Sequence, residues 1–403
     1  MMGKPNQLEP KLFYHGVSLD RRMPEDHSLR KIDQLVDFDF IRSKVADLYG
    51  TRGNESVDPA VILKLMFLLF YENIKSERAL MSQLPLRMDW LWFCGYDLDE
   101  KTPDHSVISK ARRRWGLEVF TGFFENILTQ CVDAGLVDGE TIHVDSSMID
   151  ANASKDTLKC QFRVVSHNLY EELEDNAEPK QQKLERRIST TDPDARLGKK
   201  YGKTTLGYKD HRAIDDKEGI ITATVTTPAN VNDDKVLPDV ITEHQTNTYT
   251  KVKAADKAYG TGENYEYLHE KGITPCISHA RKNCNRDTAF NHDKFLYNKE
   301  QNIYICPAGN QLKFSHFNCE KNASIYKANR KTCRQCLHFQ GCVTSKNAGR
   351  QIQRNANEEY IEWADNSLSK YERKRLMARR KHKAEGSFAD AANNHGFKRS
   401  RFR

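Results

Sequence analysis

The hydrophobic pattern of the 403-residue chain changes near residue 141, and this change constrains the fold more than any other feature. Before it, apolar residues recur at helical spacing. After it, residues 141–144 and 220–227 form short β-branched runs of the kind found in strands. The sequence therefore predicts an all-helical domain over residues 1–135, followed by an α/β domain over residues 136–403.

The clearest helix start lies in the first part, where Asp58 precedes Pro59. An aspartate can cap the free amide groups of a first turn, and proline fits there because that turn needs no N–H bond from it. The apolar run that follows, residues 60–70, carries Lys64 and is shorter than the ~20 residues of a bilayer span. We expect it to be a buried helix, and we expect no membrane association.

The second part combines strands with helices. Residues 252–256 and 273–277 read as strands on either side of a helix over 263–271, a unit that favours parallel pairing. Two stretches lack this regularity: residues 155–205 are polar and residues 281–357 are rich in cysteine. We expect both to be insertions into the α/β core.

Charge and cysteine content narrow the class of protein. Residues 370–403 hold twelve lysines and arginines against three acidic residues, a local +9 in a chain of net +7, so the remaining residues sum to −2. Such a segment favours a polyanionic partner. The ten cysteines follow a start without an apolar export segment, which is typical of a reducing compartment. We expect a cytoplasmic protein.

Two aspartates stand where strands are expected to end. Asp145 follows the run 141–144, and Asp256 closes the run 252–256. In open α/β sheets, groups that act on ligands gather beyond the carboxyl ends of strands. The alternative is that each aspartate caps a turn or the next helix.

A third carboxylate, Glu385, lies in the basic C-terminal segment. On a helix it would share a face with Met377, Lys381, Phe388 and Ala392. A carboxylate buried on such a face needs a cation beside it, and a divalent metal would serve. The alternative is a solvated glutamate paired with Lys381.

Together, Asp145, Asp256 and Glu385 would suit a pair of Mg²⁺ or Mn²⁺ ions ~4 Å apart, the arrangement used for in-line attack at phosphorus. One ion would activate water or a DNA 3′-hydroxyl, and the other would stabilise the leaving oxygen. Without metal the three carboxylates would repel one another.

Three segments of the chain resemble the catalytic segments of bacterial insertion-sequence DDE transposases. They are residues 143–154, 255–260 and 384–390, and they contain the three acidic residues in order. The resemblance implies a ribonuclease H-like core, Mg²⁺ held by these three residues, cleavage of duplex DNA at the element's ends, and strand transfer. Because two ends must be cut and joined together, we expect a homodimer, and we expect it in the bacterial cytoplasm in association with the nucleoid.

Further stretches extend the resemblance to roughly residues 30–403. The helical block at 56–70 looks like the N-terminal domain of one group of these enzymes, and residues 189–196 and 207–211 resemble the stretch between their first strands. Many members place a tyrosine, an arginine and a lysine around the glutamate; those places hold Ala378, Lys381 and Ala392 here.

The chain ends 18 residues after Glu385, earlier than the resemblance leads us to expect. A truncated remnant that binds DNA without cutting it is therefore the alternative to an active transposase.

Four cysteines of the second insertion have spacing that suits tetrahedral Zn²⁺: Cys306, Cys333, Cys336 and Cys342. His316, Cys319 and His338 are substitute ligands. The alternative is a small core of free thiols. A catalytic zinc centre is a further alternative, but four thiolates would leave no open position for water.

Basic residues are expected to carry DNA affinity through phosphate contacts. The candidates are Arg112, Arg113 and Arg114 in the helical domain and Arg379, Arg380 and Lys381 beside Glu385. The first cluster suggests a helix-turn-helix-like reader of the terminal repeats, with a solvated helix face as the alternative. Neither cluster identifies a DNA sequence.

Overall fold

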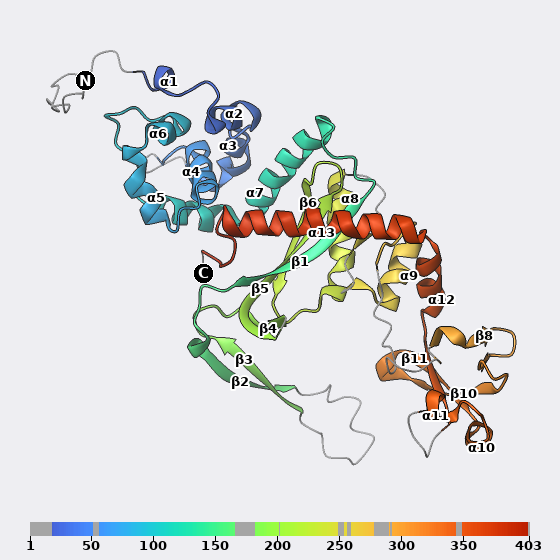
Figure 1. The fold of residues 1–403 in the computed structure, drawn as a ribbon. Helices are drawn as coiled ribbons and strands as arrows, with labels where there is room; N and C mark the ends of the chain where they lie inside the picture. The colour runs from blue at the N-terminus through green and yellow to red at the C-terminus, as the bar shows by residue number, and fades with distance from the viewer. Residues whose placement is uncertain are drawn as a thin grey trace, which may run out of the picture.

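The computed structural model has a helical domain, a central α/β unit and a small β-rich module. The long helix α13 crosses the central unit, from the side of the β-rich module to the side of the helical domain (Figure 1). It describes residues 18–50, 56–165, 182–200, 202–248, 254–255, 259–277, 290, 292–343 and 349–401.

The first described residues fold entirely into helices, as predicted. They are α1 (Leu19–Arg22), α2 (Ser28–Leu35), α3 (Phe40–Val45), α4 (Pro59–Tyr71), α5 (Glu77–Gln83), α6 (Met88–Cys94) and α7 (Ser106–Asp133). The predicted start of α4 is confirmed, because Asp58 Oδ1 accepts the amide of Ala60 at 3.0 Å and Pro59 occupies the first turn. Seven residues of α4 are buried, which explains its apolar run.

A five-stranded sheet forms the centre of the α/β unit. Its strands are β1 (Ile142–Asp150), β4 (Arg196–Lys200), β5 (Lys203–Asp215), β6 (Ile221–Pro228) and β7 (Ala254–Ala255). The order is β4-β5-β1-β7, with β6 on β5 as well. Strands β1 and β7 are parallel and the other pairs antiparallel, so the predicted mixed α/β class with some parallel pairing is confirmed.

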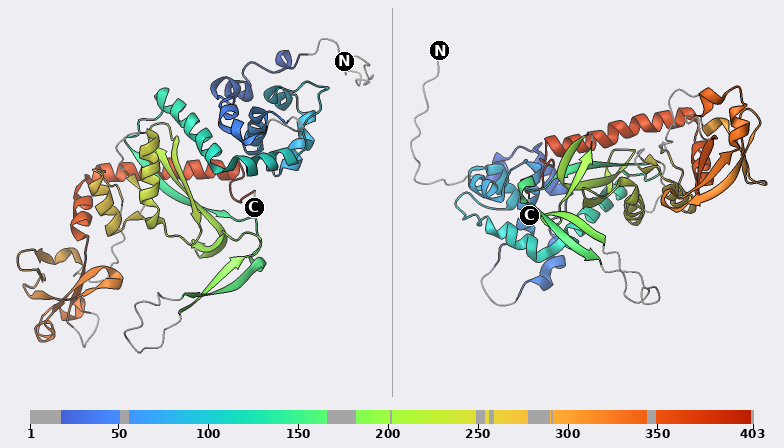
Figure 2. Two further views of the ribbon diagram at one scale, coloured as in Figure 1. Left: turned by 180° about the vertical axis from the view of Figure 1, so that it is seen from behind. Right: turned by 90° about the horizontal axis from the view of Figure 1, so that it is seen from below.

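Helices cover both faces of this sheet. On one face, Ile142 and Val144 of β1 pack against α8 (Leu237–Thr248) and α9 (Gly262–Glu270). Helix α13 (Lys370–Asn393) crosses the other face and is reached through α12 (Glu358–Asn366) (Figure 2). The predicted helix over 263–271 is confirmed, and it ends before Gly272 with φ +67°.

The strand predicted at residues 273–277 is wrong. This segment is irregular and buried between α9 and α13 instead: Tyr265 Oη donates to the carbonyl of Ile277, and Cys276 packs against Leu376. Burial between two helices accounts for its apolar sequence without any strand pairing.

The stretch expected to be a polar insertion divides between two sheets. Strands β2 (Leu158–Val165) and β3 (Gln182–Ser189) form a separate two-stranded ribbon, whereas β4 and the first residues of β5 belong to the central sheet. The domain boundaries themselves stay a prediction.

The Cys-rich stretch folds into its own antiparallel sheet, of order β12-β11-β10-β9-β8. Its elements are β8 (Leu296–Asn298), β9 (Ile303–Ile305), β10 (Gln311–Asn318), β11 (Ala323–Ala328), α10 (Arg330–Arg334), α11 (Phe339–Cys342) and β12 (Gln351–Asn355). We call residues 292–355 the β module. It lies at the start of α13, far from the helical domain (Figures 1 and 2).

The last described residues tie the helical domain to the sheet. Asp150 at the end of β1 exchanges backbone bonds with Lys398 and Ser400. Arg401 donates to the carbonyls of Leu69 in the last turn of α4 and of Ile74 just after that helix. Of the helices that the structure describes, none is both long and apolar enough to cross a bilayer.

Candidate active site

The prediction that a strand ends before Asp145 is wrong: β1 runs on to Asp150, and Asp145 lies within it, on the face of the sheet that α13 covers. Its Oδ2 is 2.9 Å from Nη1 of Arg380, and its Oδ1 accepts the amide of Ser146 at 2.7 Å. The two side chains are only 16% and 13% exposed. The aspartate is therefore a largely buried carboxylate whose charge a guanidinium of α13 balances.

A second guanidinium lies next to this pair. Arg212 is the cross-strand partner of Asp145, so the two side chains share one face of the sheet. Its Nε donates to Asp210 at 2.7 Å, its Nη1 donates to Ser387 Oγ at 3.0 Å, and its plane lies over the ring of Phe388. Sequence reasoning missed Arg212, although period-2 spacing along β5 places it on the same face as Asp210.

The parallel pairing of β1 with β7 relates the two predicted aspartates. Val144 pairs with Ala255, and each is the residue immediately before one of the aspartates. Asp256 itself lies outside the described residues.

Glu385 is exposed on α13, so the predicted packing face of this helix is wrong. The face that meets the sheet contains Leu376, Arg380 and Ala384, one residue before the predicted series, and Ala384 is 0% exposed. One residue turns a helix by 100°, which moves Glu385 and Lys381 to the solvent side. In the part of the chain that the structure describes, no three His, Cys, Asp or Glu residues are arranged to hold a metal ion.

A second ion pair fixes α13 near the start of β1. Arg379 Nη2 is 2.8 Å from Asp216 Oδ2, while Asp216 Oδ1 lies 2.8 Å from Nε2 of the buried His143. Burial lowers the pKa of His143 below its usual value, and the neighbouring Asp216 opposes that shift. Two adjacent arginines of α13 are thus ion-paired to the central α/β unit, Arg379 to Asp216 after β5 and Arg380 to Asp145 of β1.

The other face of β1 carries a polar cluster at the level of Ser146. Its Oγ donates to Asp233, which also accepts Nζ of Lys209 at 2.8 Å. Nearby, burial lowers the pKa of His211 to about 4, and its ring bonds with Tyr259 Oη. Neutral imidazole and paired charges make this side of the strand rigid.

The arginine triplet of the helical domain does not act as one surface. Arg112 is ion-paired to Glu77 and half-buried, whereas Arg113 and Arg114 are exposed and Arg114 lies over the ring of Tyr49. Of the three, Arg113 and Arg114 are placed to meet a ligand from solvent.

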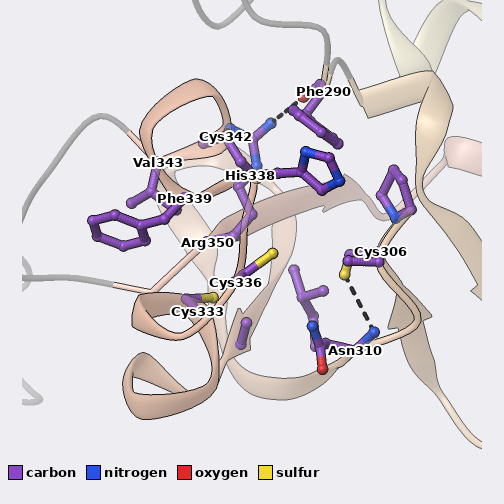
Figure 3. Close-up of a pocket in the computed structure, with 14 residues that line it drawn as sticks. Phe290, Cys306, Asn310, Cys333, Cys336, His338, Phe339, Cys342, Val343 and Arg350 are labelled. Carbon is purple, nitrogen blue, oxygen red and sulfur yellow. Dashed lines mark hydrogen bonds between the residues drawn. The ribbon is translucent and has the colours of Figure 1, made fainter.

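The four cysteines predicted to bind zinc line one cavity of about 30 Å³ in the β module, together with His338 (Figure 3). Cys333 and Cys336 flank the end of α10, and Cys306 Sγ accepts the amide of Asn310 at 3.3 Å. Burial, and then the other three thiols, raise the pKa of Cys342. The sulfurs share a site, but as they stand they do not form a set of metal ligands.

Comparison with known protein families covers most of the chain. The family described as transposase domain (DUF772) matches residues 17–114, which is the helical domain up to the first part of α7. Two families described as transposase DDE domain match residues 182–318 and 305–403. The chain belongs to the insertion-sequence DDE transposases. The predicted resemblance is thereby confirmed, and no curated protein matches the chain.

The family matches include only two of the three predicted catalytic residues. Asp256 and Glu385 lie inside the DDE matches, and Asp145 lies outside all three. The transposase is therefore a DNA-acting enzyme of a class that uses divalent cations such as Mg²⁺, while the role of each residue is a separate question.

Proposed function

We propose that this transposase cuts duplex DNA at the ends of its element and joins those ends to a target, with Asp145, Asp256 and Glu385 as catalytic carboxylates. The observation that carries the proposal is the parallel pairing of His143–Val144 with Ala254–Ala255. In both strands an aspartate follows directly after the paired residues, so Asp145 within β1 and Asp256 after β7 come at corresponding positions of two neighbouring parallel strands. A ribonuclease H-like core is part of the same proposal.

The donor chemistry at this place suits a hard divalent cation. Carboxylate oxygens are the ligands that Mg²⁺ and Mn²⁺ prefer. When bound, two such ions supply Lewis acidity to the attacking and leaving oxygens at phosphorus. For Asp145 to act as a ligand, the guanidinium of Arg380 has to leave its carboxylate.

The chain's own cations would then serve the substrate. Arg380, released from Asp145, can donate to the phosphate that is being cut, because a guanidinium can bind two phosphate oxygens at once. Arg212 holds Ser387 and thereby fixes the register of α13 against β5. Glu385 on the exposed side of α13 would have to turn toward the aspartates when DNA and metal are bound.

DNA binding is expected at two places, the helical domain and the middle of α13. Arg113 and Arg114 of the helical domain would contact the terminal repeats, and Arg379, Arg380 and Lys381 would contact phosphates beside the catalytic carboxylates. Because two ends must be cut and joined together, we propose a homodimer that works on DNA in the bacterial cytoplasm.

We also propose that the four thiols of the β module bind one structural Zn²⁺. Their shared cavity and the Cys333–Cys336 spacing support this, and the four thiols would have to draw closer together when the metal binds. Zinc content by elemental analysis, with unfolding midpoints before and after chelation, tests the proposal. One zinc per chain and destabilisation on chelation are expected; an unchanged midpoint would contradict it.

The catalytic proposal is tested with Asp145→Asn on DNA carrying the element's ends, in Mg²⁺ and in Mn²⁺. Cleavage should fall by at least about 100-fold while DNA affinity changes less than about twofold, since the variant loses a metal ligand and no phosphate contact. Asp150→Asn is the matched control on the same strand, because its side chain is exposed and only its backbone is bonded to the C-terminal segment. Wild-type cleavage by Asp145→Asn would end the assignment.

A DNA-binding protein that does not cut is the second candidate. The exposure of Glu385 and the ion pair of Asp145 with Arg380 favour it, since both describe a chain without an assembled metal site. Tight DNA binding by the wild type, with no cleavage in either metal ion, would select this candidate.

A further inference from the structure

The β module carries a concentrated positive charge. Residues 292–355 contain eleven lysines and arginines and three acidic residues, a net +8, which exceeds the +7 of the whole chain. The basic C-terminal segment does not account for this charge, because it begins after the module ends. A module with such an excess attracts polyanions from a distance.

One face of the module's sheet carries exposed polar side chains, and its five strands contain no acidic residue. Strand register places Lys313 opposite Lys327, and Lys327 opposite Gln351, so these three form a row across β10, β11 and β12. Two residues along, His316 and Gln353 flank Ile325 in a second row. Of these six side chains only Ile325 is buried; the others are exposed hydrogen-bond donors. We call the five exposed residues the lysine face.

The central pair of this face is unfavourable in the protein alone. Like charges directly opposite each other on antiparallel strands destabilise a sheet. Throughout the described residues, neither Lys313 nor Lys327 makes an ion pair, although Lys299 of the same module pairs with Glu359. An anion that bridges the two ammonium groups would relieve the repulsion.

The position of the module narrows the choice of anion. Helix α13 has 24 residues and is therefore about 36 Å long. The module lies at its beginning and the helical domain near its end, with Asp145 in between (Figures 1 and 2). A DNA duplex can span that distance with about ten base pairs.

We propose that the lysine face binds the phosphate backbone of duplex DNA, on the side of the cleavage site opposite to the helical domain. Lysines, glutamines and a histidine offer donors to phosphate oxygens without reading base sequence. The proposal deepens the proposed function by adding a second DNA contact, and it rests on that function only for the location of the cleavage site.

The test measures binding of the full-length chain to a fluorescein-labelled 30-base-pair duplex by anisotropy, without divalent metal, between 50 and 200 mM salt. Lys313→Glu with Lys327→Glu should weaken binding roughly 10-fold or more at 50 mM salt. The slope of log K against log salt should become shallower by about 2, the value for two lost phosphate contacts. Lys313→Arg with Lys327→Arg keeps both charges and should bind within about twofold of wild type.

A matched reversal separates this local effect from net charge. Lys271 is exposed at the end of α9 and lies outside residues 292–355, so Lys271→Glu changes the chain's charge as much as Lys313→Glu does without altering the module. Lys313→Glu should weaken binding several-fold more than Lys271→Glu. Equal effects would overturn the proposal, because only total charge would then matter.

Lysine acetylation read by mass spectrometry gives a second measurement that needs no variant. Bound duplex should slow the modification of Lys313 and Lys327 at least about threefold relative to Lys271. Unprotected lysines, or an unchanged salt slope in the double reversal, would overturn the proposal. Because none of these measurements uses cleavage, failure of the catalytic assignment would leave their outcome unaffected.

Discussion

Arg380 and Asp145 form an ion pair of 2.9 Å between the middle of α13 and strand β1. The residues are 235 positions apart in the chain, and both side chains are mostly buried. The guanidinium occupies the carboxylate that the proposed mechanism assigns to a metal ion. If Asp145 binds the metal as proposed, the pair couples the position of α13 to that binding.

Arg380→Gln should expose this coupling. The metal-free variant should lose roughly 3 kcal/mol of stability, because a mostly buried carboxylate loses the guanidinium that is paired with it. Adding Mn²⁺ should then raise the unfolding midpoint more in the variant than in the wild type, since the cation replaces the guanidinium. Arg375→Gln, at an exposed position of the same helix, is the control for changing the charge of α13. Equal Mn²⁺ responses in both variants and the wild type would contradict the coupling.

Arg401 links the C-terminal segment to the helical domain. Its guanidinium donates to the carbonyls of Leu69, Ile74 and His395 and to Asn73 Oδ1. Arg401→Ala should destabilise this junction by roughly 3 kcal/mol, because it removes a charged donor from three part-buried carbonyls at once. Limited proteolysis should cut the variant faster between the helical domain and β1.

Arg399→Ala is the matched control for that experiment. Arg399 is exposed and lies beside Asp150 through its backbone alone. It should be cut at the wild-type rate. Similar cleavage of both variants would show that charge in the C-terminal segment, and not the hydrogen bonds of Arg401, holds the junction.

Gly207 permits the close approach of β5 to the end of β1. A Cβ added there would collide with the carbonyl oxygen of Ile149 and contact the amide of Ala151. Backbone atoms on both sides cannot move aside as a flexible side chain can, so Gly207→Ala should destabilise the central sheet by about 2 kcal/mol or more.

A second glycine supplies the comparison. Gly122 lies within α7, where an added Cβ would meet no atom within 4 Å. Gly122→Ala should stabilise the protein by up to about 1 kcal/mol, because alanine is the better helix former. Urea denaturation of both variants tests the pair, and equal unfolding midpoints would refute the steric reading of Gly207.

His244 should make the stability of the α/β unit depend on pH. It is 0% exposed on α8, its Nδ1 bonds with Thr222 Oγ1 at 2.8 Å, and burial lowers its pKa to about 4. The unfolded chain takes up a proton near pH 6.5, whereas the folded chain does so only near pH 4. Stability from this residue is therefore complete above pH 6.5 and is lost as the pH falls toward 4, by at most about 3 kcal/mol.

Chemical denaturation at pH 7.5 and pH 5.0 measures this effect. The wild type should lose more stability between the two pH values than His244→Asn, which has no imidazole to protonate. Parallel losses in both proteins would assign the pH dependence to other groups.

Local chemistry made several elements predictable from sequence. Asp58 and Pro59 specify the start of α4 because a cap needs only the residues beside it. Gly272 likewise marks the end of α9, and β-branched residues mark β6. Each of these signals acts within a few positions of the residue that carries it.

The rotation of α13 was not predictable in this way. Its sequence is so polar that only Leu376 and Ala384 are buried, and a sparse apolar pattern leaves the packing face undetermined within one residue. What orients the helix is a set of polar contacts with distant strands: Arg379 with Asp216, Arg380 with Asp145, and Ser387 with Arg212. Sequence reasoning had no means to pair residues so far apart.

The sequence by itself determined the helical first part, the start of α4, the strand β6, the division near residue 141, and the kinds of side chain available for chemistry, because caps, turns and apolar periods act over short distances. Only the tertiary structure decided which partners meet: Asp145 with Arg380, Lys313 with Lys327, and the C-terminal segment with both α4 and β1. These contacts join residues separated by as many as 332 positions, and their geometry depends on strand register and helix rotation, which a one-residue shift reverses.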